Sequence, residues 1–232
     1  DTRHPMTPST PAQAAPGTTP MSAGTVVFVL SLLLGIQPVT TDLYLPALPA
    51  ITSGFGATLS QAQLTLTGML LAFGLSQMVW GPLSDRVGRR PVLLAGLGLY
   101  VLAAVGALLA SSMGWLIVWR VLQGAAMGAA VMAGRAIVRD LYAPEEGARV
   151  LSKALSGLGV IAALSAPVGS WLASTWGWRA ALGALAVFSG LALLVVATRF
   201  KETLAQRKPQ ATQLRVMLAN WRRILAHPTF WT

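Results

Sequence analysis

The chain has 232 residues, of which 54% are hydrophobic and 10% are charged, and its formal net charge is +10. Soluble globular domains carry roughly 25% charged residues, so this composition excludes a water-soluble body coated with polar side chains. Cysteine is absent, and the only histidines, His4 and His227, lie outside the apolar stretches. Disulfides, thiol catalysis and a buried metal site are therefore not expected within these residues.

The positive charge does not indicate nucleic-acid binding. Arg and Lys collect in the connections between apolar stretches and in the C-terminal segment. Membrane topology and anionic lipid headgroups account for charge placed in this way. The lipid bilayer is the expected partner, and no nucleic acid is expected.

Residues 1–23 are rich in Pro, Thr, Ser and Ala and are typical of a disordered tail. A predicted bundle follows over residues 24–200. It contains six apolar stretches of about 20 residues, the length an α-helix needs to cross a ~30 Å hydrocarbon core. These stretches cover residues 24–45, 62–82, 91–111, 114–138, 150–174 and 180–198. The predicted fold class is an all-α membrane protein.

The distribution of Arg and Lys predicts how the bundle is oriented. The tail, the second and fourth connections and the segment after the last stretch hold nearly all of these residues, whereas the opposite connections hold only Arg179. The positive-inside rule therefore places the N-terminus and the end of the sixth span in the cytoplasm.

Asp42 lies late in the first span, roughly 25 Å from its cytoplasmic start at ~1.5 Å per residue. A carboxylate in hydrocarbon costs about 2.5–3.5 kcal/mol, so Asp42 is expected to face water or a partner. One interpretation is a site for protons and cations. The other is an acid at the outer interface that caps the chain before Pro46.

Arg120 lies early in the fourth span, ~8 Å from its outer end, and so at a depth similar to that of Asp42. It shares a helical face with Gly124 and Gly128, and such small residues permit close helix approach. We expect Arg120 to pair with Asp42 or to compete for the same proton-dependent interaction. The alternative is an arginine that extends outward to the headgroups.

A charged connection of about ten residues, Gly-Pro-Leu-Ser-Asp-Arg-Val-Gly-Arg-Arg, joins the second and third spans. Its glycines are expected to allow tight turning, Asp85 to receive a helix N-terminus, and Arg89 to pair with Asp140. The connection then acts as a conformational latch. The alternative is that its charges serve only to orient the spans in the membrane. The predicted latch residues are Gly81, Asp85, Arg86, Gly88, Arg89, Arg90 and Asp140.

Two further sets of residues are predicted to contribute. Pro167, followed by Gly169, is expected to kink the fifth span, although an ordinary packing kink is also consistent with these residues. A mixed apolar, Met-rich and aromatic lining suits varied lipophilic ligands, although packing or lipid contact explains each residue alone. The candidate cavity residues are Gln37, Tyr44, Met69, Phe73, Gln77, Gln123 and Met127.

These motifs resemble those of the major facilitator superfamily, in particular its drug:proton antiporter branch and the Bcr/CflA type of bacterial drug-resistance transporter. Residues 81–90 match the superfamily's loop 2–3 motif, residues 42–49 match the branch's exit from the first span, and residues 120–124 match the fourth-span motif. The match is weaker after Pro167, where Gly-Ser-Trp replaces the expected pair of glycines.

The resemblance implies the six-helix N-terminal half of a twelve-helix transporter, built from two inverted three-helix repeats. Residues 201–228 are then a cytoplasmic linker with an amphipathic interfacial helix, and residues 229–232 begin a truncated seventh span. Asp42 would alternate between protonated and substrate-bound states, and Arg120 would tune its proton affinity. The latch would grip the missing C-terminal half and stabilise the outward-open state.

The implied activity is proton-driven export of small lipophilic drugs across the bacterial inner membrane, with the proton gradient as energy source and no cofactor. Proton-coupled uptake of a metabolite is the alternative within transport, and a non-transporting scaffold or inactive fragment is the alternative outside it. An enzyme is not predicted, because the spans contain no Ser-His-Asp set, no HExxH motif and no paired carboxylates.

Overall fold

The structure is a computed structural model, and it describes residues 21–204, 207 and 209–212. The predicted tail up to residue 20, the predicted amphipathic helix and the predicted start of a seventh span lie outside the described residues. The helices are α1 (Ala23–Asp42), α2 (Leu48–Gly54), α3 (Leu59–Val87), α4 (Arg89–Leu108), α5 (Met113–Leu141), α6 (Pro144–Trp176) and α7 (Trp178–Arg199), with 3-10 turns η1 (Leu45–Ala47) and η2 (Pro209–Thr212).

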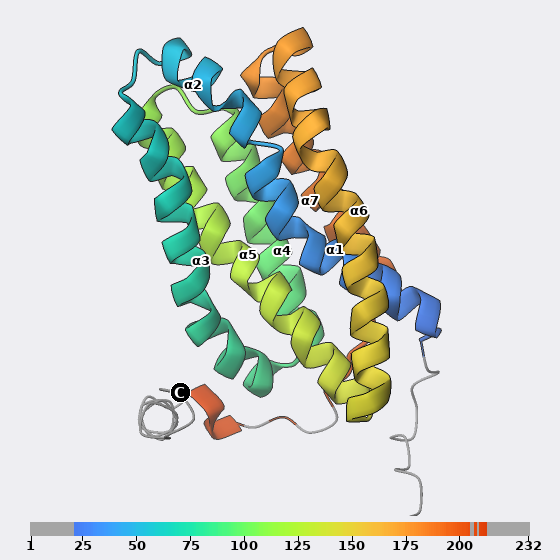
Figure 1. Ribbon diagram of the computed structural model, residues 1–232. Helices are drawn as coiled ribbons and strands as arrows, with labels where there is room; N and C mark the ends of the chain where they lie inside the picture. The colour runs from blue at the N-terminus through green and yellow to red at the C-terminus, as the bar shows by residue number, and fades with distance from the viewer. Residues whose placement is uncertain (1–20, 205–206, 208, 213–232) are drawn as a thin grey trace, which may run out of the picture.

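Six helical segments of the described part are long and apolar enough to cross a membrane. The first of them combines α1, η1 and α2, and the others are α3 to α7. The predicted six spans are therefore confirmed. Figure 1 shows these long helices side by side as a bundle, with η2 beneath the end of α3.

Several helices are longer than the apolar stretches that predicted them. The second span was expected over residues 62–82, whereas α3 runs from Leu59 to Val87. Thr58 and Gln61 form a capping box that starts α3 before the apolar region begins. Local hydrogen bonds, and not hydropathy, decide where such a helix starts and stops.

The connection between α3 and α4 differs most from expectation. It is not a ten-residue hairpin, because helix continues through Gly81 and Pro82 and only Gly88 is non-helical. Gly88 has φ +121°, a backbone conformation that residues with a Cβ rarely adopt. The chain therefore reverses at one residue, and Gly81 takes no part in the turn.

Close packing of small residues holds the bundle together. A Cβ on Gly124 would overlap the backbone carbonyl of Met69, and a Cβ on Gly128 would overlap Ser76, so α3 and α5 approach each other at backbone distance. The predicted close approach along this face is confirmed. Most residues in the apolar windows of the first span and of α5 are buried within the bundle, whereas few of those in α3 and α6 are.

Candidate functional site

Arg120 lies in the interior of the bundle, in the second turn of α5, and its side chain is fully buried. One turn further along, α5 packs closely on α3, because a Cβ on Gly124 would overlap the backbone carbonyl of Met69. Because the side chain is fully buried, the alternative that Arg120 extends outward to the headgroups does not hold.

The Arg120 guanidinium contacts neutral groups. Nη1 donates a hydrogen bond to Gln123 Oε1 at 2.7 Å, and Nη2 donates to the Thr40 carbonyl at 3.1 Å. Its Cζ lies 4.1 Å from the centroid of the Tyr44 ring, which is cation–π geometry. Arg120 Nε is buried with no hydrogen-bond partner among the residues that the structure describes. The polar groups of this cluster are thus only partly satisfied.

Asp42 is the last residue of α1 and is half-buried. Its carboxylate accepts a hydrogen bond from the Thr41 hydroxyl at 2.8 Å. Within the described residues, Asp42 does not form an ion pair with Arg120. Arg120 instead donates a hydrogen bond to the backbone carbonyl of Thr40, two residues before Asp42. Competition between the two for a proton-dependent interaction stays a prediction.

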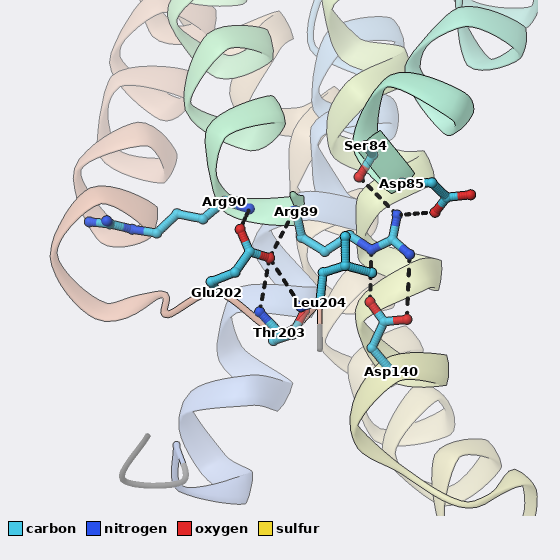
Figure 2. A network of polar contacts seen from close by, with 8 residues as sticks. All are labelled: Ser84, Asp85, Arg89, Arg90, Asp140, Glu202, Thr203 and Leu204. Atoms are coloured by element: carbon cyan, nitrogen blue, oxygen red, sulfur yellow. Dashed lines mark hydrogen bonds and ion pairs between the residues drawn. The ribbon is translucent and has the colours of Figure 1, made fainter. Parts of the chain in front are cut away.

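A second buried arginine, Arg89, lies at the opposite end of the bundle, where α3 meets α4. Its Nε donates to Asp140 at 2.7 Å and its Nη1 lies 2.7 Å from Asp85. Nη1 also donates to the Ser84 hydroxyl at 2.9 Å. Figure 2 shows the guanidinium between the two carboxylates. The predicted pair between Arg89 and Asp140 is confirmed, and it ties the start of α4 to the end of α5.

The N-terminus of α4 is capped by Glu202, which follows α7 in the chain. Its carboxylate accepts hydrogen bonds from the backbone N–H groups of Arg89 at 2.8 Å and Arg90 at 3.2 Å (Figure 2). It also accepts from the N–H groups of Thr203 and Leu204, at 3.0 and 3.1 Å. A carboxylate at this position satisfies free donors and complements the helix dipole.

Two residues of the predicted latch, Gly88 and Arg90, contact the end of α7 and the segment that follows it. A Cβ at position 88 would overlap the Glu202 carboxylate, so Gly88 is required for space as well as for its backbone conformation. Arg90 reaches across to α7, where Nη2 donates to the Ala197 carbonyl at 2.9 Å. Sequence analysis missed Glu202, although a signal existed, because it is the only acidic residue after Glu146.

The remaining latch residues are dispersed. Arg86 is exposed and donates to the Thr212 hydroxyl of η2 at 2.6 Å. Gly81 lies within α3 with open space where a Cβ would be. Asp85 contacts Arg89, and the helix N-terminus expected near Asp85 is not among its contacts in the described residues.

The predicted kink residues lie next to the Asp42 segment. Helix α6 continues through Pro167, and a Cβ on Gly169 would overlap the backbone carbonyl of Leu43. The backbone of α6 therefore packs directly on the residue that follows Asp42. Whether Pro167 acts as a functional kink stays a prediction.

The predicted cavity residues divide into two groups. Gln37 is exposed, and Phe73 and Gln77 are partly exposed. Four others are fully buried in this conformation: Tyr44, Met69, Gln123 and Met127. A cavity of about 380 Å³ lies instead between α3 and α5 at the Arg89 end, where Gln77, Arg135 and Arg139 contribute to its lining.

Comparison with known proteins identifies the family. The model of the Major Facilitator Superfamily matches residues 21–232. The chain is 38% identical to the "Chloramphenicol resistance protein" of Pseudomonas aeruginosa over 191 residues, which are 80% of this chain and 45% of the relative. It is 32% identical to "Multidrug resistance protein D" of Escherichia coli over 155 residues, which are 67% of this chain and 39% of the relative. The chain therefore spans about half the length of the relatives it matches.

Solved structures show the same fold. The proton:xylose symporter XylE aligns with a TM-score of 0.67 at 17% identity, covering 88% of this chain and 49% of that one. The human organic anion transporter MFSD10 aligns with a TM-score of 0.64 at 23% identity, covering 84% and 52%. At these identities the likeness shows the fold alone.

Proposed function

This chain belongs to the major facilitator superfamily, and we propose that it forms the N-terminal half of a proton-coupled multidrug efflux transporter of the Bcr/CflA type. Its family and fold are those of multi-pass membrane transporters. Relatives named for chloramphenicol resistance and multidrug resistance support drug export as the activity. The proposed substrates are small lipophilic drugs, exported across the bacterial inner membrane by alternating access.

The observation that carries the proposal is the environment of Arg120. Its guanidinium is fully buried and, within the described residues, has no carboxylate in ion-pair distance. A buried charge without a counter-charge is expensive, and intramembrane charges of this kind typically mark ion or substrate pathways. The Thr40 carbonyl, which accepts a hydrogen bond from Arg120, lies two residues before Asp42 in the chain.

We infer a cycle in which the proton is held at the Asp42 carboxylate. Protonated Asp42 is neutral and needs no cation, so Arg120 stays on the Thr40 carbonyl. When Asp42 loses its proton, the carboxylate attracts the guanidinium or a bound substrate. Proton and substrate therefore exclude each other, which is the requirement for antiport. The proton gradient drives this cycle without a cofactor.

The Arg89 cluster serves as the latch in this proposal. It joins α3, α4 and α5 at one end of the bundle, and Glu202 adds the segment after α7. From the excess of Arg and Lys at this end, we propose that it lies in the cytoplasm together with the N-terminus. We propose that the latch grips a C-terminal six-helix half in the outward-open state.

Drug accumulation in cells expressing the full-length reading frame tests the proposal. The wild type is compared with Asp42→Asn and with the matched control Glu145→Gln, which neutralises an exposed acid at the start of α6. We expect wild type and control to lower chloramphenicol accumulation, and expect Asp42→Asn or a protonophore to abolish the effect. If Asp42→Asn exports as well as wild type at equal expression, Asp42 is an interfacial cap and the mechanism is wrong.

The same assay separates the alternatives. Accumulation that rises with expression of the wild type and collapses with a protonophore supports proton-coupled uptake. Equal accumulation with and without the protein, over a panel of lipophilic drugs, supports a scaffold or an inactive fragment.

A further inference from the structure

Tyr44 lies two residues after the end of α1, directly before η1, and is fully buried. Its ring faces the Arg120 guanidinium, with the Arg120 Cζ 4.1 Å from the ring centroid. This position does not suit a residue that lines an open cavity, which was the expectation from sequence. The ring is in contact with the buried cation instead.

The hydroxyl of Tyr44 is held by α3. Thr65 Oγ1 donates to the Ala62 carbonyl at 2.6 Å, which uses its only hydrogen. Tyr44 Oη lies 2.8 Å from Thr65 Oγ1, so the tyrosine must be the donor of this bond. The direction of the ring is therefore set by α3, while its face is turned to a residue of α5.

Thr40, whose carbonyl accepts a hydrogen bond from Arg120, is held in the same way by α4. Its hydroxyl donates to the Ile36 carbonyl, so Tyr100 Oη donates to Thr40 Oγ1 at 2.5 Å. Tyr100 is fully buried as well. Two tyrosines thus brace the surroundings of Arg120, but only Tyr44 offers the cation its ring face.

The charge of Arg120 is balanced by few groups. A guanidinium has five N–H donors, and the hydrogen bonds of Arg120 in the described residues go to one amide oxygen and one carbonyl. Both acceptors are neutral, and Nε has none. The negative face of an aromatic ring is the remaining source of compensation, and it is strongest where water is excluded.

We propose that Tyr44 is a positioning residue for Arg120. Its ring holds the guanidinium on the Thr40 carbonyl while Asp42 is not paired with it. Because Thr65 anchors the ring, a movement of α3 relative to α1 shifts the ring and with it Arg120. The part of this inference that concerns transport rests on the proposed function, whereas the contact itself does not.

A substitution series in the full-length reading frame tests the role in transport. Tyr44→Phe keeps the ring and loses the hydroxyl, and Tyr44→Leu keeps an apolar side chain without a ring. We expect export within about threefold of wild type for Phe and a loss of about tenfold for Leu. Phenylalanines with one, two and three ring fluorines at position 44 should lower export stepwise, because fluorine weakens the negative face with little change in size.

The series also separates this inference from the proposed function. If Asp42→Asn abolishes export while Tyr44→Leu and the fluorinated rings match wild type, the proposed function stands and Tyr44 has only a packing role. A stepwise fluorine effect supports the inference, because a packing role does not depend on the ring's charge distribution.

A double-mutant cycle on the purified protein in detergent tests the contact between Tyr44 and Arg120 independently of transport. Tyr44→Leu is measured in the wild-type and Arg120→Met backgrounds, with Phe55→Leu as control, since Phe55 contacts Trp178 and not Arg120. We expect Tyr44→Leu to lower the melting temperature by about 2–4 °C in wild type and by less than half as much without the cation. Equal shifts in both backgrounds, as expected for Phe55→Leu, would overturn the proposal.

Discussion

Arg89 and Arg120 are both buried in the bundle, but their surroundings differ in one decisive respect. Arg89 lies between the carboxylates of Asp85 and Asp140 and donates further to Ser84. Arg120 contacts an amide, a carbonyl and an aromatic ring, all of them neutral. The first charge is balanced within the bundle and the second is not.

We expect this difference to separate an arginine needed for stability from one needed for transport. Removing one partner of a buried ion pair leaves an uncompensated charge and is strongly destabilising. Removing a buried charge that has no counter-ion relieves a penalty. We therefore expect the arginine that matters most for stability to be Arg89 and the arginine that matters most for transport to be Arg120.

The largest effect is expected for transport by Arg120→Met. Loss of the only cation in the interior cluster should lower drug export by about 100-fold, equivalent to ~2.7 kcal/mol. The melting temperature should be unchanged or higher, because an apolar side chain replaces an unbalanced charge. Export assays and thermal unfolding of the same purified variant measure both. A melting temperature lower than that of the corresponding Arg89 variant would contradict the comparison.

The next largest effect is expected for stability in Arg89→Met. This change leaves two carboxylates without their cation and should destabilise the fold by about 3 kcal/mol. At this chain length it corresponds to a melting temperature roughly 6–12 °C lower. Restoring the balance by adding Asp85→Asn and Asp140→Asn should recover part of the loss. No recovery in the triple variant would show that the ion pairs are not the source of the stability.

A smaller loss is expected where α5 packs on α3 beside Arg120. A Cβ in Gly124→Ala would overlap the backbone of Met69, so the helices must move apart at a cost of about 1–3 kcal/mol. Gly81→Ala is the matched control, because open space surrounds that position within the same helix pair. It should be neutral or slightly stabilising, since alanine favours helix. Thermal unfolding of both variants tests the close approach, and equal melting temperatures would exclude it.

The smallest effect is expected for Glu202→Gln, which keeps the shape of the α4 cap and removes its charge. Caps of this kind contribute about 0.5–2 kcal/mol, and the amide retains part of the bonding. We expect the melting temperature to fall by about 1–4 °C. Glu145→Gln, at the exposed start of α6, is the control for loss of a surface charge. A fall equal to that of the control would remove Glu202 from the latch.

Sequence was sufficient for much of the fold. Apolar stretches of membrane length predicted the six long helices, because a hydrocarbon core requires about 20 apolar residues per span. The pairing of Arg89 with Asp140 was predicted from charges placed at the ends of neighbouring spans. The close approach at Gly124 and Gly128 followed from helical spacing alone. These features depend on local composition and periodicity.

Other features were decided by tertiary structure alone. No spacing rule brings Glu202 to the start of α4, more than 100 residues earlier in the chain. The same holds for Tyr44, whose ring lies under Arg120 only because α1, α3 and α5 pack together. Periodicity states which face of a helix is apolar, but the partner that meets that face is selected by packing. Sequence by itself therefore determined the spans and the charged residues, while the structure determined that, among the described residues, one buried arginine is neutralised and the other has no counter-charge.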